Sequence, residues 1–300
     1  MIENSTMVKP LTYHKPRSIE EALRILDDSG AEARILAGGQ DIVPVMNQGR
    51  FAPCSLVDVR ELTAVNGVRS QNGSMIIGAL TTHRNIERSE LIRARCGLLA
   101  DAAGQIGGGV QVRNRGTIGG AVCAGNPVYD FAPCLVALGA EFQLRSVNGE
   151  RRIAAADFFL DANKTALRPN ELLTEITIPI ASSTVSFAYE KLKFSDGCYC
   201  IASAASTVEL NPDGSCRLVR LTLGGVSATP IRVSQVEADV RGSQVSDELL
   251  GRVSATAQES VSDPISDVHA DGEYRRAMAG VVARRALTKA FQRAHRGVEG

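Results

Sequence analysis

The stretch RNRGTIGGAVCAGNPVYD (Arg113–Asp130) decides how this chain is interpreted, because it places the glycine pair Gly119–Gly120 between two arginines and a lone acid. An earlier stretch, RILAGGQDIVPV (Arg34–Val45), carries a second pair, Gly38–Gly39. A glycine pair at the end of a strand lets the backbone turn without a Cβ clash and leaves adjacent N–H groups exposed. Such N–H clusters bind anions, most often phosphates. A tight turn explains one pair alone, but two pairs together predict a clamp around a larger anion such as a pyrophosphate.

The glycine pairs are not one of the common nucleotide-binding motifs. Neither stretch reads GxGxxG, and no Walker A lysine follows either pair. A dinucleotide held here therefore requires another scaffold. The chain has 300 residues, which suggests two or three domains. Lys plus Arg and Asp plus Glu number 33 each, and only 4% of residues are aromatic, so we expect no nucleic-acid partner.

Targeting, membrane and metal signals are absent from the sequence. The polar start lacks an apolar signal core, and no window approaches the ~18–20 apolar residues that span a bilayer. We therefore expect a cytoplasmic chain with no membrane span. The seven cysteines form no CxxC cluster and are expected to be reduced and mostly buried, and the four histidines match no zinc spacing. The sequence predicts no metal site in this chain.

The first 60 residues predict a small unit in which a helix joins buried strands. Ser18 and Glu21 form a capping box at the start of a helix that ends at Gly30. ARILAGG (33–39) then indicates a short strand ending on the first glycine pair, and SLVDV (55–59) indicates another buried strand. The glycine turn lies at the end of its strand.

The following residues predict a second unit, from 61 to 182. A strand covers 74–80, and Thr82 caps a short helix. Residues 90–109 predict one helix of about four turns, ended by the glycines at 107–109. A short helix at 131–139, a hairpin with an Asn-Gly turn at 148–149, and a last strand at 171–180 complete the unit.

Residues 183–300 predict a third unit made of three strands followed by helices. The strands are SFAYEKLKF, YCIASAASTVEL and CRLVRLTLGGV, and the turn NPDG separates the last two. In the final helix, the side chains expected to share one face are Tyr274, Met278, Val281 and Val282.

Three stretches together resemble one known family. ARILAGGQDIVPVMNQG, VRNRGTIGGAVCAGNPVYDFAPCLVALGAEF and GEYRRAMAGVVARRAL are similar to the FAD-binding medium subunit of molybdenum hydroxylases, the group of xanthine dehydrogenase and carbon monoxide dehydrogenase. The resemblance covers nearly the whole chain. It implies an α+β fold, with a two-lobed FAD-binding domain of the vanillyl-alcohol-oxidase type (lobes 1–60 and 61–182). A small C-terminal α/β flavoprotein domain (183–300) with a three-stranded sheet follows.

The resemblance also implies roles for particular residues. We expect FAD to be bound non-covalently, because neither glycine loop contains a histidine, and we expect no catalytic acid, base or nucleophile. Asp130 matches an acid that holds flavin hydroxyl groups, Lys191 a lysine near the cofactor, and Leu173 an apolar wall residue. The two pyrophosphate loops match Ala37, Gly38, Gly39, Gln40, Asp41 and Ile42, and Thr117, Ile118, Gly119, Gly120 and Ala121. Gln40 replaces the usual Thr or Ser, and Ala121 replaces a frequent Asn, which removes a hydrogen bond worth ~0.5–1.5 kcal/mol.

Structural alternatives exist for the residues outside the loops. Asp130 also suits the cap of the helix that follows it, and Lys191 also suits an exposed position on an edge strand. Arg113 and Arg115 are more typical of surface ion pairs than of phosphate ligands. Tyr129 and Phe131 are more typical of a core than of flavin-stacking groups.

The resemblance implies an electron-transfer subunit within a heterotrimer or its dimer. The partners would be a large molybdopterin subunit and a small subunit with two [2Fe–2S] clusters, which would pass electrons through FAD to an external acceptor. One alternative is a self-sufficient FAD oxidase, although such enzymes often attach flavin to a histidine near the pyrophosphate loop and neither loop contains one. A flavin-free interaction subunit is a further alternative, against which the intact glycine pairs argue.

Overall fold

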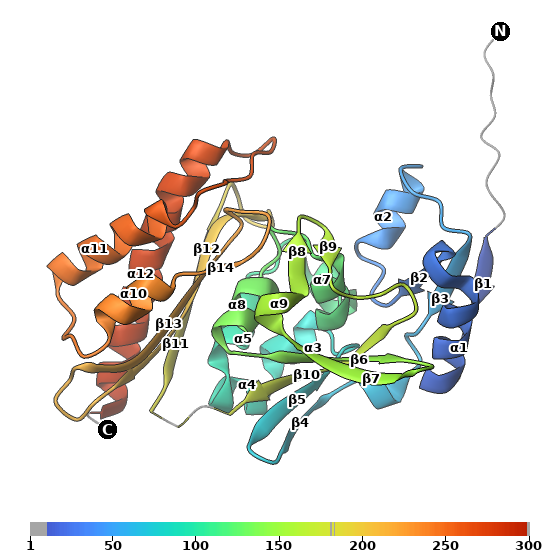
Figure 1. The fold of residues 1–300 in the computed structure, drawn as a ribbon, viewed down its shortest axis with the longest axis horizontal. Coiled ribbons are helices and arrows are strands. Elements are labelled where there is room, and N and C mark those ends of the chain that lie inside the picture. Colours follow the sequence, from blue (N-terminus) through green and yellow to red (C-terminus); the bar gives the residue numbers. More distant parts are fainter. Residues whose placement is uncertain (1–10, 181, 183, 299–300) are drawn as a thin grey trace, which may run out of the picture.

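A computed structural model describes residues 11–180, 182 and 184–298. Three sheets of three or more strands follow one another along the molecule, with the N-terminal unit at one end and the C-terminal domain at the other (Figure 1). Each sheet is associated with an apolar cluster of its own, although Leu80 and Leu172 extend the first cluster into the second unit.

The N-terminal unit is a parallel sheet covered by one helix. Its strands are β1 (Thr12–His14), β2 (Ala33–Leu36) and β3 (Ser55–Asp58), in the order β1-β3-β2. Helix α1 (Ile19–Ser29) begins where the Ser18 hydroxyl accepts a hydrogen bond from the Glu21 N–H, and it ends at Gly30 with φ +51°. The predicted capping box is therefore confirmed. A one-turn helix (Gly30–Glu32) leads into β2, and the short helix α2 (Ile42–Asn47) follows the first glycine pair.

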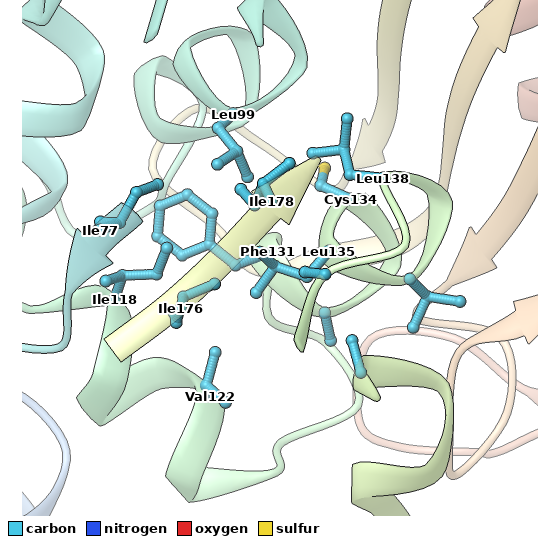
Figure 2. Close-up of a cluster of buried hydrophobic side chains, with 14 of the residues drawn as sticks. Ile77, Leu99, Ile118, Val122, Phe131, Cys134, Leu135, Leu138, Ile176 and Ile178 are labelled. Atoms are coloured by element: carbon cyan, nitrogen blue, oxygen red, sulfur yellow. The ribbon is translucent and has the colours of Figure 1, made fainter. Parts of the chain in front are cut away.

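The second unit is an antiparallel sheet with helices packed against it. The strand order is β4-β5-β10-β6-β7, with bounds Val68–Gln71, Ser74–Gly78, Leu172–Pro179, Glu141–Ser146 and Gly149–Ala154. The helices are α3 (His83–Arg88), α4 (Glu90–Arg95), α5 (Gly97–Gly104), α6 (Gly109–Arg115), α7 (Ile118–Ala124) and α8 (Phe131–Ala137). Phe131 lies at the centre of the core between helices and sheet (Figure 2). The smaller elements are η2 (Thr63–Val65), α9 (Ala155–Phe158), β8 (Phe159–Asp161) and β9 (Lys164–Thr165).

Two sequence predictions for this unit are wrong in detail. The single helix expected over 90–109 is divided into α4 and α5, because Cys96 has an extended φ of −154° and the next residue is glycine. A strand–turn–helix context is the expectation for both glycine pairs, but the second pair does not follow a strand. It instead lies in the first turn of α7, with Thr117 as the N-cap residue.

The C-terminal domain is an antiparallel sheet with its own helices on one face, and α5 and α8 of the second unit contact the sheet from the other. Its strands are β11 (Ser186–Lys193), β12 (Cys200–Leu210), β13 (Cys216–Gly224) and β14 (Ile231–Arg232), so a short fourth strand adds to the three that were expected. Helices α10 (Ser234–Val240), α11 (Asp247–Glu259) and α12 (Gly272–Val298) complete it. Strand β12 is buried along its whole length because α12 packs on one side and α8 of the second unit also contacts it. Its many Ala and Ser side chains fit this close packing.

The buried face of α12 differs from the predicted one. Tyr274 is exposed, and Met278 and Val281 are only half-buried, whereas Val282 is buried as expected. The helix buries a stripe of small residues against β11 and β12 instead, and this stripe contains Ala279, Ala283, Ala286, Ala290 and Ala294. Small side chains let a helix approach a sheet closely, and the larger side chains of Val282, Leu287 and Phe291 are buried in the same cluster.

Candidate cofactor site

The first glycine pair forms a loop whose N–H groups point to no protein acceptor. It follows β2 directly, and Gly39 has φ +73°, a value that favours glycine. Within the described part of the chain, no backbone or side-chain acceptor receives a hydrogen bond from the N–H groups of residues 38–42. The Gln40 carboxamide folds back toward the Gly38 carbonyl, with 3.4 Å between Nε2 and the oxygen. An unpaired run of N–H groups is a suitable site for an anion.

The second glycine pair is built differently. Gly119 N donates to the Ala79 carbonyl at 2.9 Å, and Gly120 N donates to the Thr117 hydroxyl at 3.1 Å. Ile118 and Ala121 also donate within the chain. The expected row of exposed N–H groups is therefore wrong for this pair. A Cβ on Gly119 would lie 2.7 Å from the Ala79 Cβ, so this glycine allows two backbone segments to approach each other.

The two glycine motifs lie against each other, although they are far apart in the sequence. A Cβ built on Gly38 would lie 2.3 Å from the Arg115 carbonyl oxygen and 2.7 Å from the Gly116 Cα. Behind Gly116 lies His83, whose backbone N–H donates to the Gly116 carbonyl at 3.0 Å. The first loop, the start of α7 and the start of α3 thus form one layered arrangement. It depends on glycine at positions 38 and 116.

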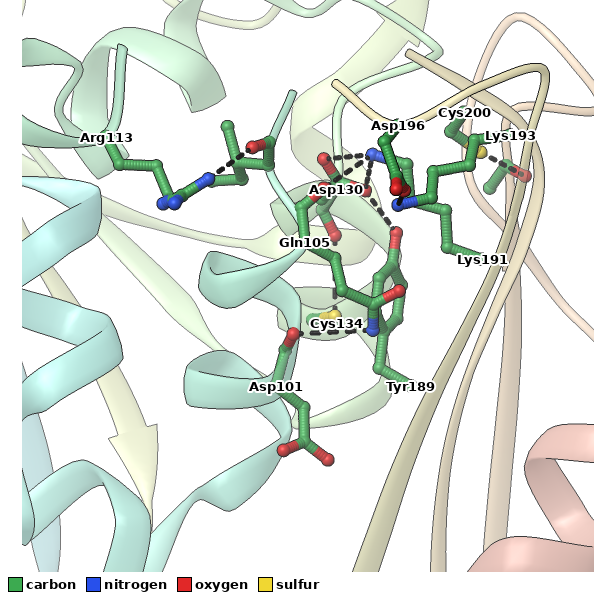
Figure 3. Close-up of polar contacts among 12 residues, drawn as sticks. Asp101, Gln105, Arg113, Asp130, Cys134, Tyr189, Lys191, Lys193, Asp196 and Cys200 are labelled. Carbon is green, nitrogen blue, oxygen red and sulfur yellow. Dashed lines mark hydrogen bonds and ion pairs between the residues drawn. The ribbon is translucent and has the colours of Figure 1, made fainter. Parts of the chain in front are cut away.

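Asp130 and Lys191 form a buried ion pair between the second unit and the C-terminal domain (Figure 3). Lys191 Nζ lies 2.9 Å from Asp130 Oδ1 and also donates to the Gln105 carbonyl at 3.0 Å. The Tyr189 hydroxyl donates to the same carboxylate at 2.6 Å. Asp130 makes no side-chain capping bond to α8, and the Lys191 side chain has no exposed surface. The alternatives of a helix cap and a surface lysine are therefore wrong.

The ion pair holds a carboxylate in an apolar environment. Burial raises the pKa of Asp130, and the charge of Lys191 and the hydrogen bonds from Tyr189 and Lys191 only partly oppose this. Burial and the adjacent carboxylate raise the pKa of Tyr189 well above its usual value, so the phenol keeps its proton and donates. Lys191 and Tyr189 offset part of the cost of burying Asp130. Their contacts with Asp130 and Gln105 link α8, the end of α5 and β11.

Tyr129 connects the first loop to the C-terminal domain. Its ring stacks on Tyr199, with 5.8 Å between centroids. Burial raises the pKa of Tyr129, and the nearby Asp41 carboxylate and Tyr199 hydroxyl raise it further. Phe131 lies in the core, as expected, whereas Tyr129 does not. Of the two arginines, Arg113 lies 3.6 Å from Glu87 and donates to the Ile106 carbonyl, which fits a structural role.

Leu173 lies apart from these contacts in the core of the second unit. It is buried in β10, where it pairs with Leu144 of β6. Four residues that contribute to the site were not singled out from the sequence, namely Gln105, His83, Tyr189 and Tyr199. The alternation of strand YEKLK could have indicated Tyr189, because residues two apart on a strand face the same side. No metal-binding group of His, Cys, Asp or Glu occurs among the described residues.

Comparisons with known proteins match the whole architecture. Residues 7–181 match the model for the FAD binding domain in molybdopterin dehydrogenase, and residues 187–290 match the CO dehydrogenase flavoprotein C-terminal domain. The chain belongs to this family of FAD-binding subunits of molybdenum-dependent oxidoreductases. The resemblance seen in the sequence is thereby confirmed.

Individual relatives cover nearly the full length of the chain. The carbon monoxide dehydrogenase medium chain of Hydrogenophaga pseudoflava is 34% identical over 96% of this chain and 99% of its own. The subunit beta of caffeine dehydrogenase from a Pseudomonas species is 30% identical over 94% of this chain and 95% of its own. A solved structure of the Hydrogenophaga enzyme, in a form lacking the Mo-pyranopterin moiety, matches with a TM-score of 0.91 at 34% identity, covering 95% of this chain and 98% of that chain. These matches confirm the expected α+β fold with its C-terminal flavoprotein domain. No helix in the described residues is long and apolar enough to cross a membrane.

Proposed function

We propose that this FAD subunit holds its flavin non-covalently across the layered glycine motifs, with the first loop as the main anion site. The observation that supports this most strongly is the unpaired run of N–H groups at residues 38–42, packed against Gly116. A pyrophosphate offers the acceptor oxygens that these donors lack. Ala37, Ile42 and residues 117–121 would border it, Leu173 would support the second unit from its core, and the Asp130–Lys191 pair would lie farther along toward the C-terminal domain.

We propose a separate role for each of the three parts of the chain that have their own apolar cluster. Residues 1–60 and 61–182 would form the two flavin lobes, and residues 183–300 the C-terminal domain that closes over them. A bound flavin supplies the redox chemistry, and the protein supplies its binding, orientation and electrostatic surroundings. The neutral Tyr189 and the buried Lys191–Asp130 pair would keep a fixed, water-poor environment at the contact between the domains.

The proposed role in the complex is electron transfer. A small partner with [2Fe–2S] clusters would deliver electrons to the flavin, a large molybdopterin partner would carry out the substrate reaction, and an external acceptor would receive the electrons. The assembly would be a heterotrimer or its dimer. Relatives act in complexes named for carbon monoxide, caffeine and other compounds, so this chain does not determine the substrate.

Acid precipitation of the purified flavoprotein tests the mode of binding. We expect all yellow colour to enter the supernatant, because neither loop contains a histidine and His83 is buried behind Gly116. Colour that remains with the denatured pellet would contradict non-covalent binding. Protein that purifies without flavin and binds none when FAD is added would favour a flavin-free interaction subunit.

The proposed electron-transfer role is tested by measuring dye reduction with the isolated chain and with the co-expressed complex. We expect substrate-dependent reduction only in a complex that contains iron, sulfide and molybdenum. The described part of this chain has no cysteine cluster that could hold a metal centre. Strong substrate-dependent reduction by the isolated chain would favour a self-sufficient oxidase instead.

A further inference from the structure

Tyr189 is a buried tyrosine of β11 whose hydroxyl donates to the Asp130 carboxylate at 2.6 Å. Lys191, two residues along the same strand, reaches both oxygens of that carboxylate, at 2.9 and 3.0 Å (Figure 3). Residues two apart on a strand face the same side of the sheet, so one strand holds Asp130 with two side chains. The Tyr189 hydrogen bond thereby fixes the orientation of a carboxylate that the ion pair alone would hold less firmly.

The connection that leads to Asp130 is also held by the C-terminal domain. Residues 125–130 join α7 to α8. Gly225 N, directly after β13, donates to the Pro127 carbonyl at 3.1 Å, and the Tyr199 ring stacks on the Tyr129 ring. With the two contacts from β11, the C-terminal domain thus fixes this connection at several points along its length.

Tyr129 carries this placement to the first glycine loop, which belongs to the N-terminal unit. Burial raises the pKa of Tyr129, and the Asp41 carboxylate beside its hydroxyl raises it further, so the phenol stays protonated and is able to donate to that carboxylate. Asp41 makes no side-chain capping bond to α2. A carboxylate that turned toward the N–H groups of the loop would occupy them and repel a phosphate. The Tyr129 hydroxyl offers the Asp41 carboxylate another partner, which holds it aside.

We infer that Tyr189 is a positioning residue for the cofactor site, which fixes Tyr129 through Asp130. Tyr129 in turn keeps the Asp41 carboxylate away from the N–H groups of the first loop. This inference rests on the proposed function, in which that loop binds the pyrophosphate of FAD. It gives a side chain of the C-terminal domain an effect on the affinity of a loop in the N-terminal unit. The hydroxyl carries this role, because the Tyr189 ring packs in the core of the second unit.

Tyr189→Phe tests the inference, because it removes the hydroxyl and keeps the ring in the core. We expect the affinity of the purified, flavin-stripped protein for FAD to fall about tenfold, as measured by a titration followed through flavin fluorescence. The lost hydrogen bond also lowers the melting temperature, so the titration is done well below it. Tyr274→Phe is the matched control, since Tyr274 is 46% exposed on α12 and should not affect FAD binding.

Tyr129→Phe tests whether Tyr189 acts through Tyr129. Because Tyr129 is only half-buried, this change should leave the fold intact. We expect it to weaken FAD binding by a similar factor, since the Asp41 carboxylate loses its partner directly. Adding Tyr189→Phe to Tyr129→Phe should then weaken binding by less than about twofold further. A purely structural contribution of Tyr189 would instead appear as a lower melting temperature with unchanged FAD affinity.

The outcomes separate the inference from the proposed function. A wild-type protein that binds no FAD, either alone or in its co-expressed complex, would overturn both. If the wild type binds FAD and either folded Tyr189→Phe or Tyr129→Phe binds it equally well, only the inference is overturned. An equal loss of affinity on adding Tyr189→Phe to the wild type and to Tyr129→Phe would also overturn it, because the effect of Tyr189 would then not pass through Tyr129.

Discussion

Lys191 and Asp130 meet in the interior although 61 residues separate them, and Lys191 Nζ lies 2.9 Å from the Asp130 carboxylate. One residue belongs to a strand of the C-terminal domain and the other to the start of a helix in the second unit. A buried ion pair contributes less to stability than its Coulomb energy suggests, because both charges lose their hydration. Its larger effect is to penalise any arrangement in which the two domains separate and leave one charge buried.

Removing the Lys191 ammonium alone should therefore lower the free energy of unfolding more than removing both charges of the pair. We expect Lys191→Met to lower the free energy of unfolding by about 3–5 kcal/mol, since Asp130 would remain buried without its partner. The double variant Asp130→Asn, Lys191→Met should recover part of this loss. Urea denaturation with saturating FAD measures the free energy of unfolding of the wild type, Lys191→Met and the double variant.

Lys193→Met provides the matched control for that experiment. Lys193 lies on the same strand, but its ion-pair partner Asp196 is 98% exposed. Exposed pairs contribute only about 0–1 kcal/mol, so this variant should be close to wild type. Equal losses for Lys191→Met and Lys193→Met would show that the buried pair has no special role.

Gly38→Ala should separate the two glycine motifs. The new methyl group would lie 2.3 Å from the Arg115 carbonyl oxygen, so the first loop must move away from Gly116. We expect flavin occupancy, measured by visible absorbance, to fall strongly. Gly251→Ala is the control, because that helical position has nothing within 4 Å of its Cβ and should gain about 0.5–1 kcal/mol of stability. Full flavin occupancy in folded Gly38→Ala would contradict the layered arrangement.

Gly119 and Gly120 should differ in their response to substitution. A Cβ on Gly119 would meet the Ala79 carbonyl at 2.7 Å, whereas one on Gly120 would meet only the Thr117 hydroxyl, at 3.0 Å. We expect Gly119→Ala to lower thermal stability even without flavin. Gly120→Val should mainly weaken FAD binding, because residue 120 is exposed in the first turn of α7. If Gly119→Ala weakened only FAD binding and Gly120→Val mainly lowered stability, the packing role of Gly119 and the binding role of Gly120 would be assigned incorrectly.

The sequence identifies most elements because their signals are local. The Ser18 capping box, the strand before Gly38 and the Asn-Gly hairpin at 148–149 each depend on neighbouring residues only, and each occurs in the structure. The helical first turn at Gly119 was missed because glycine disfavours helices. Contacts of Gly119 with Ala79, which the local sequence does not reveal, determine its conformation.

The chemistry of the site is less predictable than its location. Both glycine motifs were found, but the free N–H groups of the first and the bonded N–H groups of the second depend on which backbone segments pack nearby. The side-chain contacts of Asp130 likewise come from residues 59 and 61 positions away. Such long-range partners follow from the packing of whole domains, to which periodicity and propensity are insensitive.

His83 should make the protein sensitive to mild acid. Its ring packs on Phe131 with 5.3 Å between centroids, and its Nδ1 is buried without a hydrogen-bond partner among the described residues. Burial lowers the pKa of His83 from 6.5 to about 4. Between these two pH values the unfolded chain binds a proton that the folded chain excludes, so the free energy of unfolding decreases as the pH falls. The full effect is on the order of 3 kcal/mol.

His83→Gln should remove this part of the acid sensitivity, because the amide does not titrate. We expect the difference in unfolding free energy between pH 7 and about pH 4.5 to be smaller in this variant than in the wild type, by urea denaturation at each pH. His269→Gln is the control, since that ring is exposed and should leave the difference nearly unchanged. Charging of His83 would also place a cation behind Gly116, so the pH at which flavin is released should shift together with stability. Identical pH profiles for His83→Gln and wild type would show that other groups control acid unfolding.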